Sequence, residues 1–129
     1  MIMEEKLRPK RILVIEDDRA LNRAITFKLG RKGYEAISVF SAEDGLKVLE
    51  QGEPVDFIWL DLLLPGMNGF DFLKTIRDSQ ELRNKRVVVV SASGNEESER
   101  QAKDLGVVAY IVKSDYNLDD IVDRVSRDI

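Results

Sequence analysis

Four short apolar runs constrain the fold of this chain more than any other feature of its sequence. They are RILVI (11–15), VDFIWL (55–60), RVVVV (86–90) and VVAYIV (107–112). Each has the length of a strand, is rich in β-branched residues and barely alternates, which is typical of parallel strands covered on both faces. A weaker and more alternating run, YEAISVF (34–40), predicts a fifth strand at an edge of the sheet.

A segment with helical periodicity follows each of these five runs. Helices are predicted over residues 19–30, 42–51, 69–78, 95–105 and 117–128. In the first helix, an i, i+4 ridge is expected from Ala20, Leu21, Ala24, Ile25, Lys28 and Leu29. Asn117 is expected to cap the last helix. The helix over 95–105 has only Ala102 and Leu105 as apolar anchors, so it should pack weakly and move easily.

The strict alternation of strands and helices predicts an α/β fold with helices on both faces of a parallel sheet. Five strands favour a flavodoxin-like (βα)5 doubly wound parallel sheet with strand order 2-1-3-4-5. Ligands of such sheets bind beyond the carboxyl ends of the strands, near the first and third strands. The 129 residues are predicted to form one domain over 11–129, after a short charged leader over 1–10.

Composition narrows the available chemistry. The chain has no cysteine and no histidine, which excludes disulfides, thiolate and imidazole metal sites and a histidine-based triad. Its net charge of −4 argues against general binding to nucleic acid. No apolar run has the length of a membrane helix, and the leader lacks the apolar core of a signal peptide. A cytoplasmic protein without nucleic-acid or membrane partners is therefore expected.

Acidic residues follow two strands that are neighbours in the predicted order. Glu16, Asp17 and Asp18 come after the first strand, and Asp61 comes after the third. Two or three of these carboxylates should converge on Asp61, and like charges at such range disfavour joint ionisation unless a cation is present. A cluster of oxygen ligands alone favours a hard ion, Mg²⁺ before Mn²⁺ or Ca²⁺. The sequence therefore predicts a divalent-cation site at this edge of the sheet.

Each residue at this edge also has a purely structural interpretation. Acidic residues after a strand favour the first turn of a helix, and Lys113 alone would be an ordinary surface charge. Ser91 alone would cap the next turn, and Pro65 and Gly69 are common turn residues. Their occurrence together at one edge of one sheet favours a site for phosphate chemistry.

The motifs ILVIEDD, LDLLLPGMNG, VVVVSAS and YIVKSD occur in this order between residues 10 and 128. Together they resemble the receiver domain of bacterial two-component response regulators, in particular the single-domain, chemotaxis-regulator-like members. The resemblance implies that Asp61 is the phosphoacceptor. It also implies that Glu16, Asp17, Asp61 and the backbone carbonyl of Leu63 hold Mg²⁺, or Mn²⁺ in its place.

The resemblance assigns further roles around the acceptor. Ser91 and Lys113 are expected to bind the phosphoryl oxygens, and Tyr110 is expected to act with Ser91 as a switch. Leu63 and Ser93 occupy positions that tune dephosphorylation in the family. Since Leu63 cannot orient an attacking water through its side chain and Ser93 could do so only weakly, slow autodephosphorylation, lasting minutes or more, is expected.

The resemblance also implies a function and partners. The phosphoryl group would come from a sensor histidine kinase or a histidine phosphotransfer protein. The chain would catalyse its own phosphorylation and dephosphorylation and would not be an enzyme acting on other substrates. The signal would reach a downstream protein through the face formed by the fourth helix, the fifth strand and the fifth helix.

One departure from the family and several alternatives stay open. Ser114 stands where the family commonly has a proline, so the usual reason for a cis peptide after Lys113 is missing. The main alternative is a degenerate receiver that binds partners without being phosphorylated. A haloacid-dehalogenase-type phosphatase would need a second aspartate where Leu63 stands. An FMN site and a nucleotide-binding P-loop lack their motifs. The chain would act alone or as part of a larger protein.

Overall fold

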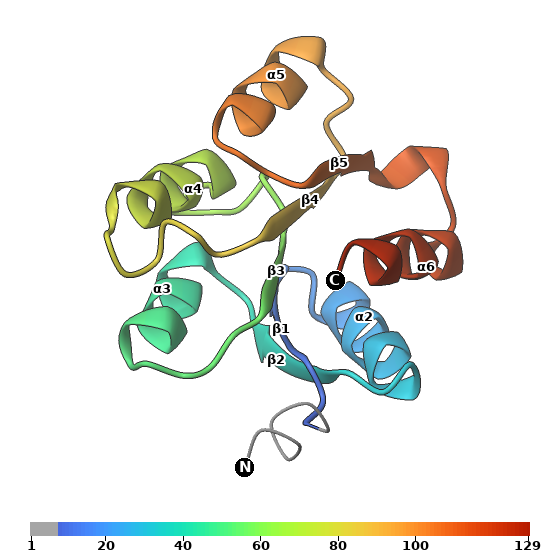
Figure 1. Ribbon diagram of the computed structural model, residues 1–129. Coiled ribbons are helices and arrows are strands. Elements are labelled where there is room, and N and C mark those ends of the chain that lie inside the picture. Colours follow the sequence, from blue (N-terminus) through green and yellow to red (C-terminus); the bar gives the residue numbers. More distant parts are fainter. Residues whose placement is uncertain (1–7) are drawn as a thin grey trace.

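The computed structural model describes residues 8–129, so most of the predicted leader lies outside the described residues. Strands and helices alternate along the chain (Figure 1). In order, the elements are β1 (Arg11–Ile15), α2 (Arg19–Arg31), β2 (Glu35–Val39), α3 (Ala42–Glu50), β3 (Phe57–Leu60), α4 (Gly69–Asp78), β4 (Val87–Ser91), α5 (Glu96–Asp104), β5 (Ala109–Val112), the 3₁₀ turn η1 (Lys113–Asp115) and α6 (Leu118–Asp128).

The five strands form one parallel sheet in the order β2-β1-β3-β4-β5. Helices α3, α4 and α5 cover one face of the sheet, and α2 and α6 cover the other (Figure 1). The predicted flavodoxin-like (βα)5 fold, its strand order and the position of β2 at an edge are confirmed. Within residues 8–129, no helix combines the length and the apolar character that crossing a bilayer would require.

The central strand β3 explains why the apolar runs barely alternate. Ile58 and Leu60 pack into the core beneath α3 and α4, whereas Phe57 and Trp59 pack into the core beneath α2 and α6. All four side chains are essentially inaccessible to solvent. Burying one large apolar side chain contributes about 1.5–3 kcal/mol, so a strand with two covered faces gains from an apolar residue at every position.

The observed boundaries differ from the predicted ones by at most two residues. Strand β5 begins at Ala109 and not at 107 because Gly106 has φ +78° and the Val107 N–H donates to the Ala102 carbonyl. These two features end α5, so Val107 belongs to the helix terminus. Strand β4 extends to Ser91, which is therefore the last residue of the strand.

Two helix predictions have different outcomes. The Asn117 side chain accepts a hydrogen bond from the Asp120 N–H, so the predicted cap of α6 is confirmed. The predicted ridge of α2 was partly wrong, because the buried residues of that helix are Asn22, Ile25 and Leu29. Ala20 is exposed, and hydrophobicity alone could not place the amide of Asn22 in the interior.

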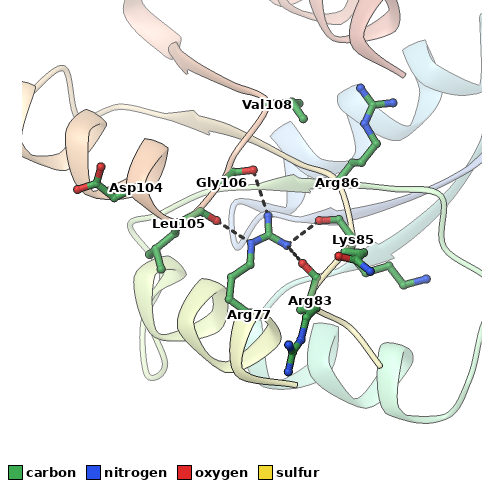
Figure 2. A pocket seen from close by; sticks show the side chains of 9 residues that line it. Arg77, Arg83, Lys85, Arg86, Asp104, Leu105, Gly106 and Val108 are labelled. Atoms are coloured by element: carbon green, nitrogen blue, oxygen red, sulfur yellow. Dashed lines mark hydrogen bonds between the residues drawn. The ribbon is translucent and has the colours of Figure 1, made fainter. Parts of the chain in front are cut away.

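Helix α5 is held mainly at its carboxyl end. Within the helix only Ala102 is buried, as its few apolar residues predicted. Arg77, in the last turn of α4, donates to the carbonyls of Leu105 (2.6 Å) and Gly106 (3.3 Å), which directly follow α5. The same guanidinium donates to the carbonyls of Arg83 and Lys85, and all four bonds meet at the edge of a cavity of about 420 Å³ (Figure 2).

Candidate functional site

The carboxyl ends of β1, β3 and β5 bring three of the predicted site residues together. Asp61 directly follows β3, and its N–H donates to the Ile15 carbonyl at the end of β1 (3.1 Å). Glu16 follows β1, and Lys113 follows β5. Asp61 is only 4% exposed and Glu16 only 1%. The backbone positions of both carboxylates are thus set by the hydrogen-bonded ladder of the sheet.

Lys113 bridges the two buried carboxylates. Its Nζ lies 2.6 Å from Oε1 of Glu16 and 3.0 Å from Oδ2 of Asp61. Burial raises the pKa of Glu16, Asp61 adds to this rise, and Lys113 offsets it only in part. Burial opposes the charge of Lys113, but the bond to Glu16 and the attraction of Asp61 outweigh it and raise the pKa of Lys113. The single ammonium of Lys113 therefore neutralises only part of the negative charge of the two carboxylates.

Glu16, Asp17 and Asp61 form the acidic cluster that the sequence predicted. Each offers an oxygen, and these oxygens lie within 4.8 Å of one another. When all groups are ionised, three carboxylates and the Lys113 ammonium leave two negative charges in excess. Oxygen ligands and this excess suit a hard divalent cation such as Mg²⁺ or Mn²⁺. The residues present therefore fit such an ion.

The three carboxylates differ in how far they are already engaged. Glu16 uses both oxygens, since Oε1 accepts from Lys113 and Oε2 accepts from the Asp18 N–H (3.1 Å). Asp17 is exposed to solvent. The Asp17 carboxylate is therefore accessible to an ion, whereas both oxygens of Glu16 are already hydrogen-bonded.

Leu63 contacts Asp61 through its backbone. Its N–H donates to Oδ1 of Asp61 (3.1 Å), while its side chain is 59% exposed. The loop after β3 thus holds the carboxylate without placing an apolar group against the core. The role of the Leu63 carbonyl as a metal ligand stays a prediction.

Ser91, Ser93 and Tyr110 form a second group at the same edge. Ser91 is fully buried at the end of β4, and its hydroxyl accepts from the Ser93 N–H (3.4 Å). The Tyr110 hydroxyl donates to the Ser93 carbonyl (2.7 Å), and its ring packs into the core beneath α3 and α4. The backbone of Ser93 therefore connects the two predicted switch residues. Among the hydrogen bonds of residues 8–129, none joins Ser91 to Asp61 or Lys113.

The sequence left open whether the peptide bond between Lys113 and Ser114 is cis or trans. The Lys113–Ser114 peptide bond is trans, and residues Lys113–Asp115 form the turn η1. Lys113 therefore reaches the acidic cluster although the peptide bond that follows it is trans.

Two features near the site were not predicted from the sequence, namely the lack of space for a side chain at Gly69 and the burial of Asn22. Gly69 is the first residue of α4, where the predicted helix over 69–78 was expected to begin, and a Cβ there would lie 2.6 Å from Cα of Leu62. Such a requirement has no local sequence signal. Asn22 is fully buried beside Glu16. Asn22 lies three residues before Ile25, a spacing that places both on the buried face of α2, but hydrophobicity alone does not indicate a buried amide.

Comparison with known proteins gives consistent matches. A family model described as "Response regulator receiver domain" matches residues 12–126. The transcriptional regulatory protein AfsQ1 of Streptomyces coelicolor is 34% identical over 102 residues, which cover 79% of this chain and 44% of that protein. This chain thus spans less than half the length of that relative. Sporulation initiation phosphotransferase F of Bacillus subtilis is 28% identical over 120 residues, 92% of each chain.

Solved structures match over nearly the whole chain. The Mn²⁺-bound form of response regulator Rcp1 superposes with a TM-score of 0.83 at 29% identity, covering 92% of each chain. The phosphorylated cyanobacterial phytochrome response regulator RcpA gives a TM-score of 0.81 at 31% identity, covering 92% of this chain and 90% of that one.

Proposed function

The chain belongs to the response regulator receiver domain family, and on this basis we propose that Asp61 is the aspartate that receives the phosphoryl group. One observation carries the proposal. Asp61 stands at the carboxyl end of β3, with Lys113 Nζ at 3.0 Å and two further carboxylates beside it. Phosphoryl transfer needs an aligned nucleophile surrounded by positive charge and little else from the protein.

The phosphoryl donor is a sensor histidine kinase or a histidine phosphotransfer protein, in the cytoplasm. An oxygen of the Asp61 carboxylate attacks the phosphorus, and the P–N bond to the donor histidine breaks. The bonding electron pair stays on the imidazole nitrogen, which takes up a proton, and an acyl phosphate forms on Asp61. The chain promotes this transfer and the later hydrolysis on itself and does not turn over other substrates.

Glu16, Asp17, Asp61 and the Leu63 carbonyl would hold Mg²⁺, with Mn²⁺ as the alternative ion. When bound, the ion supplies positive charge that offsets the charge of the phosphoryl oxygens. The choice of a divalent ion is supported by the convergence of the three carboxylates. It is also supported by the relative Rcp1, whose structure is described as Mn²⁺-bound.

Lys113 and Ser91 bind the phosphoryl oxygens. The ammonium of Lys113 already touches Oδ2 of Asp61, so it adds charge stabilisation next to the reacting group. The Ser91 hydroxyl accepts from the Ser93 N–H, which leaves its own proton free to donate to a phosphoryl oxygen.

The signal leaves the site through Ser91, Ser93 and Tyr110. A rotation of the Ser91 hydroxyl toward the phosphoryl group would break its contact with the Ser93 N–H, and the Ser93 carbonyl holds Tyr110. Helix α5 follows this segment and is weakly anchored at its amino end. The face formed by α5, β5 and α6 then changes its affinity for a downstream protein.

The alternatives are not favoured. A degenerate receiver would be expected to lack a residue that phosphoryl transfer needs, whereas Asp61, Lys113 and the acidic cluster are all present. A haloacid-dehalogenase-type phosphatase would need an acid where Leu63 stands.

The test is incubation with Mg²⁺ and a small phosphodonor, followed by intact-mass measurement. One phosphoryl group is expected on the wild type and on Asp115→Asn, which alters an exposed acid at the same edge. Asp61→Asn should take none. An adduct that survives in Asp61→Asn, or no Mg²⁺-dependent adduct on the wild type, would overturn the proposal.

A further inference from the structure

One buried polar residue has no role in the proposed reaction. Among residues 8–129, the buried polar residues are Glu16, Asn22, Asp61 and Ser91. Three of these belong to the proposed site. Asn22 lies on α2, where the helix covers β1 and β2, and is completely inaccessible to solvent. Burying an amide is unfavourable unless its hydrogen bonds are made, so its contacts indicate what it does.

The Asn22 carboxamide holds the ends of two strands. Its Nδ2 donates to the carbonyl of Glu16 (3.0 Å) and to the carbonyl of Val39 (2.8 Å). Its Oδ1 accepts from the hydroxyl of Ser38 (2.5 Å). Val39 is the last residue of β2, and Glu16 directly follows β1. Asn22 thus supplies donors to two carbonyls at the point where the chain leaves the sheet.

The loop that carries Asp17 is restrained by hydrogen bonds on both sides of this residue. Before Asp17, the carbonyl of Glu16 is bound by the Asn22 side chain. After Asp17, the Asp18 carbonyl accepts from the Asn22 N–H (2.8 Å), and the Asp18 N–H donates to Oε2 of Glu16. The exposed Asp17 carboxylate is therefore presented by a short loop that the Asn22 side chain binds on one flank, while the first backbone hydrogen bond of α2 and the Glu16 carboxylate bind the other.

We propose that Asn22 is a positioning residue for the divalent cation. It fixes the loop between β1 and α2 so that Asp17 and Glu16 meet Asp61, and Ser38 in turn orients the amide. A loop ordered before the ion arrives loses less conformational entropy on binding. This inference rests on the proposed function, because it concerns the cation site of that reaction.

The test measures Mn²⁺ affinity by electron paramagnetic resonance of the free ion. Asn22→Leu and Asn22→Ala should weaken Mn²⁺ binding roughly 10–100-fold, as changes of groups behind metal ligands commonly do. Ser38→Ala should weaken it less, because the two donors of Asn22 remain. Val125→Ala is the matched control, since it loses stability through a buried side chain of α6 but should bind Mn²⁺ as the wild type does.

A second readout needs no metal. Amide hydrogen exchange at Asp17 and Asp18 should accelerate in the Asn22 variants more than in Val125→Ala. If Asn22→Leu does not fold, Asn22→Ala and Ser38→Ala carry the comparison. Wild-type Mn²⁺ affinity in folded Asn22 variants would overturn the inference and leave the proposed function intact. A wild type that binds no Mn²⁺ would instead refute the proposed cation site and the inference with it.

Discussion

Lys113 Nζ lies 3.0 Å from Oδ2 of Asp61 although the two residues are 52 positions apart and strand β4 separates their strands. Among the described residues, Lys113 supplies the only ammonium that contacts the acidic cluster. The contact places this ammonium against the predicted phosphoacceptor. Asp61 and Glu16 share this charge, so a single ammonium offsets two buried carboxylates.

Replacing Lys113 tests how much its ammonium stabilises the two buried carboxylates. Lys113→Met should lower the free energy of unfolding by about 3 kcal/mol without divalent cations, because two buried carboxylates lose their partner. Mg²⁺ should restore part of the loss. Urea unfolding with and without Mg²⁺ measures both effects. Lys103→Met, which removes an exposed pair with Glu99, is the control and should change stability by less than about 1 kcal/mol. Equal losses in the two variants would contradict the prediction.

The lifetime of the phosphorylated state depends on Leu63. The wild type should keep its phosphoryl group for minutes or more, because neither Leu63 nor Ser93 is suited to orient water. Leu63→Asn should shorten this lifetime, since an amide at this exposed position can orient the attacking water. Phosphate release after removal of the donor measures the rate, with Val108→Asn as the control at another exposed apolar site. A wild-type half-life of seconds would refute the expectation.

Tyr110 should make stability depend on alkaline pH. Burial raises the pKa of Tyr110 above 10.0, and its bond to Ser93 opposes this rise only in part. Since the folded-state pKa is higher than the unfolded one, the stability contribution is complete below pH 10.0 and is lost as the pH rises through the folded-state pKa. Urea midpoints of wild type and Tyr110→Phe, compared across this range, should converge as the pH rises. Parallel curves would exclude the coupling.

Gly69 should not tolerate a side chain. A Cβ at this position would lie 2.6 Å from Cα of Leu62 and 2.7 Å from the Asp61 carbonyl oxygen, and backbone atoms cannot easily give way. Gly69→Ala should therefore cost about 1–3 kcal/mol. Gly30→Ala, where nothing lies within 4 Å, should gain about 0.5–1 kcal/mol by helix propensity. Thermal unfolding distinguishes the two, and a neutral Gly69→Ala would show that the loop is free to move.

Arg77 should control the carboxyl end of α5. Arg77→Lys cannot reproduce the planar fork that binds four carbonyls, so stability should fall by about 2 kcal/mol. Amide exchange at the end of α5 should also accelerate. Arg83→Lys is the control, because Arg83 lines the same cavity (Figure 2). Its side chain makes one long hydrogen bond, to the Ser79 carbonyl (3.4 Å). Unchanged exchange in Arg77→Lys would show that α5 is anchored elsewhere.

Much of the site could be predicted from the order of residues along the chain. Parallel strands end at one edge of the sheet, so Glu16, Asp61 and Lys113 had to lie at that edge once the strand order was inferred. The strands themselves could be predicted because a sheet covered on both faces needs apolar residues along the whole of each strand. The cap at Asn117 could be predicted because it depends on a hydrogen bond to Asp120, which lies close by in the sequence.

Other features depend on contacts between segments that are distant in the sequence. Whether Gly69 tolerates a Cβ is decided by the path of Leu62, and the burial of Asn22 is decided by the ends of β1 and β2. The sharing of Lys113 between Glu16 and Asp61 likewise requires the packed sheet. Local periodicity and strand order follow from the chemistry of neighbouring residues, whereas these contacts exist only when the whole chain has packed.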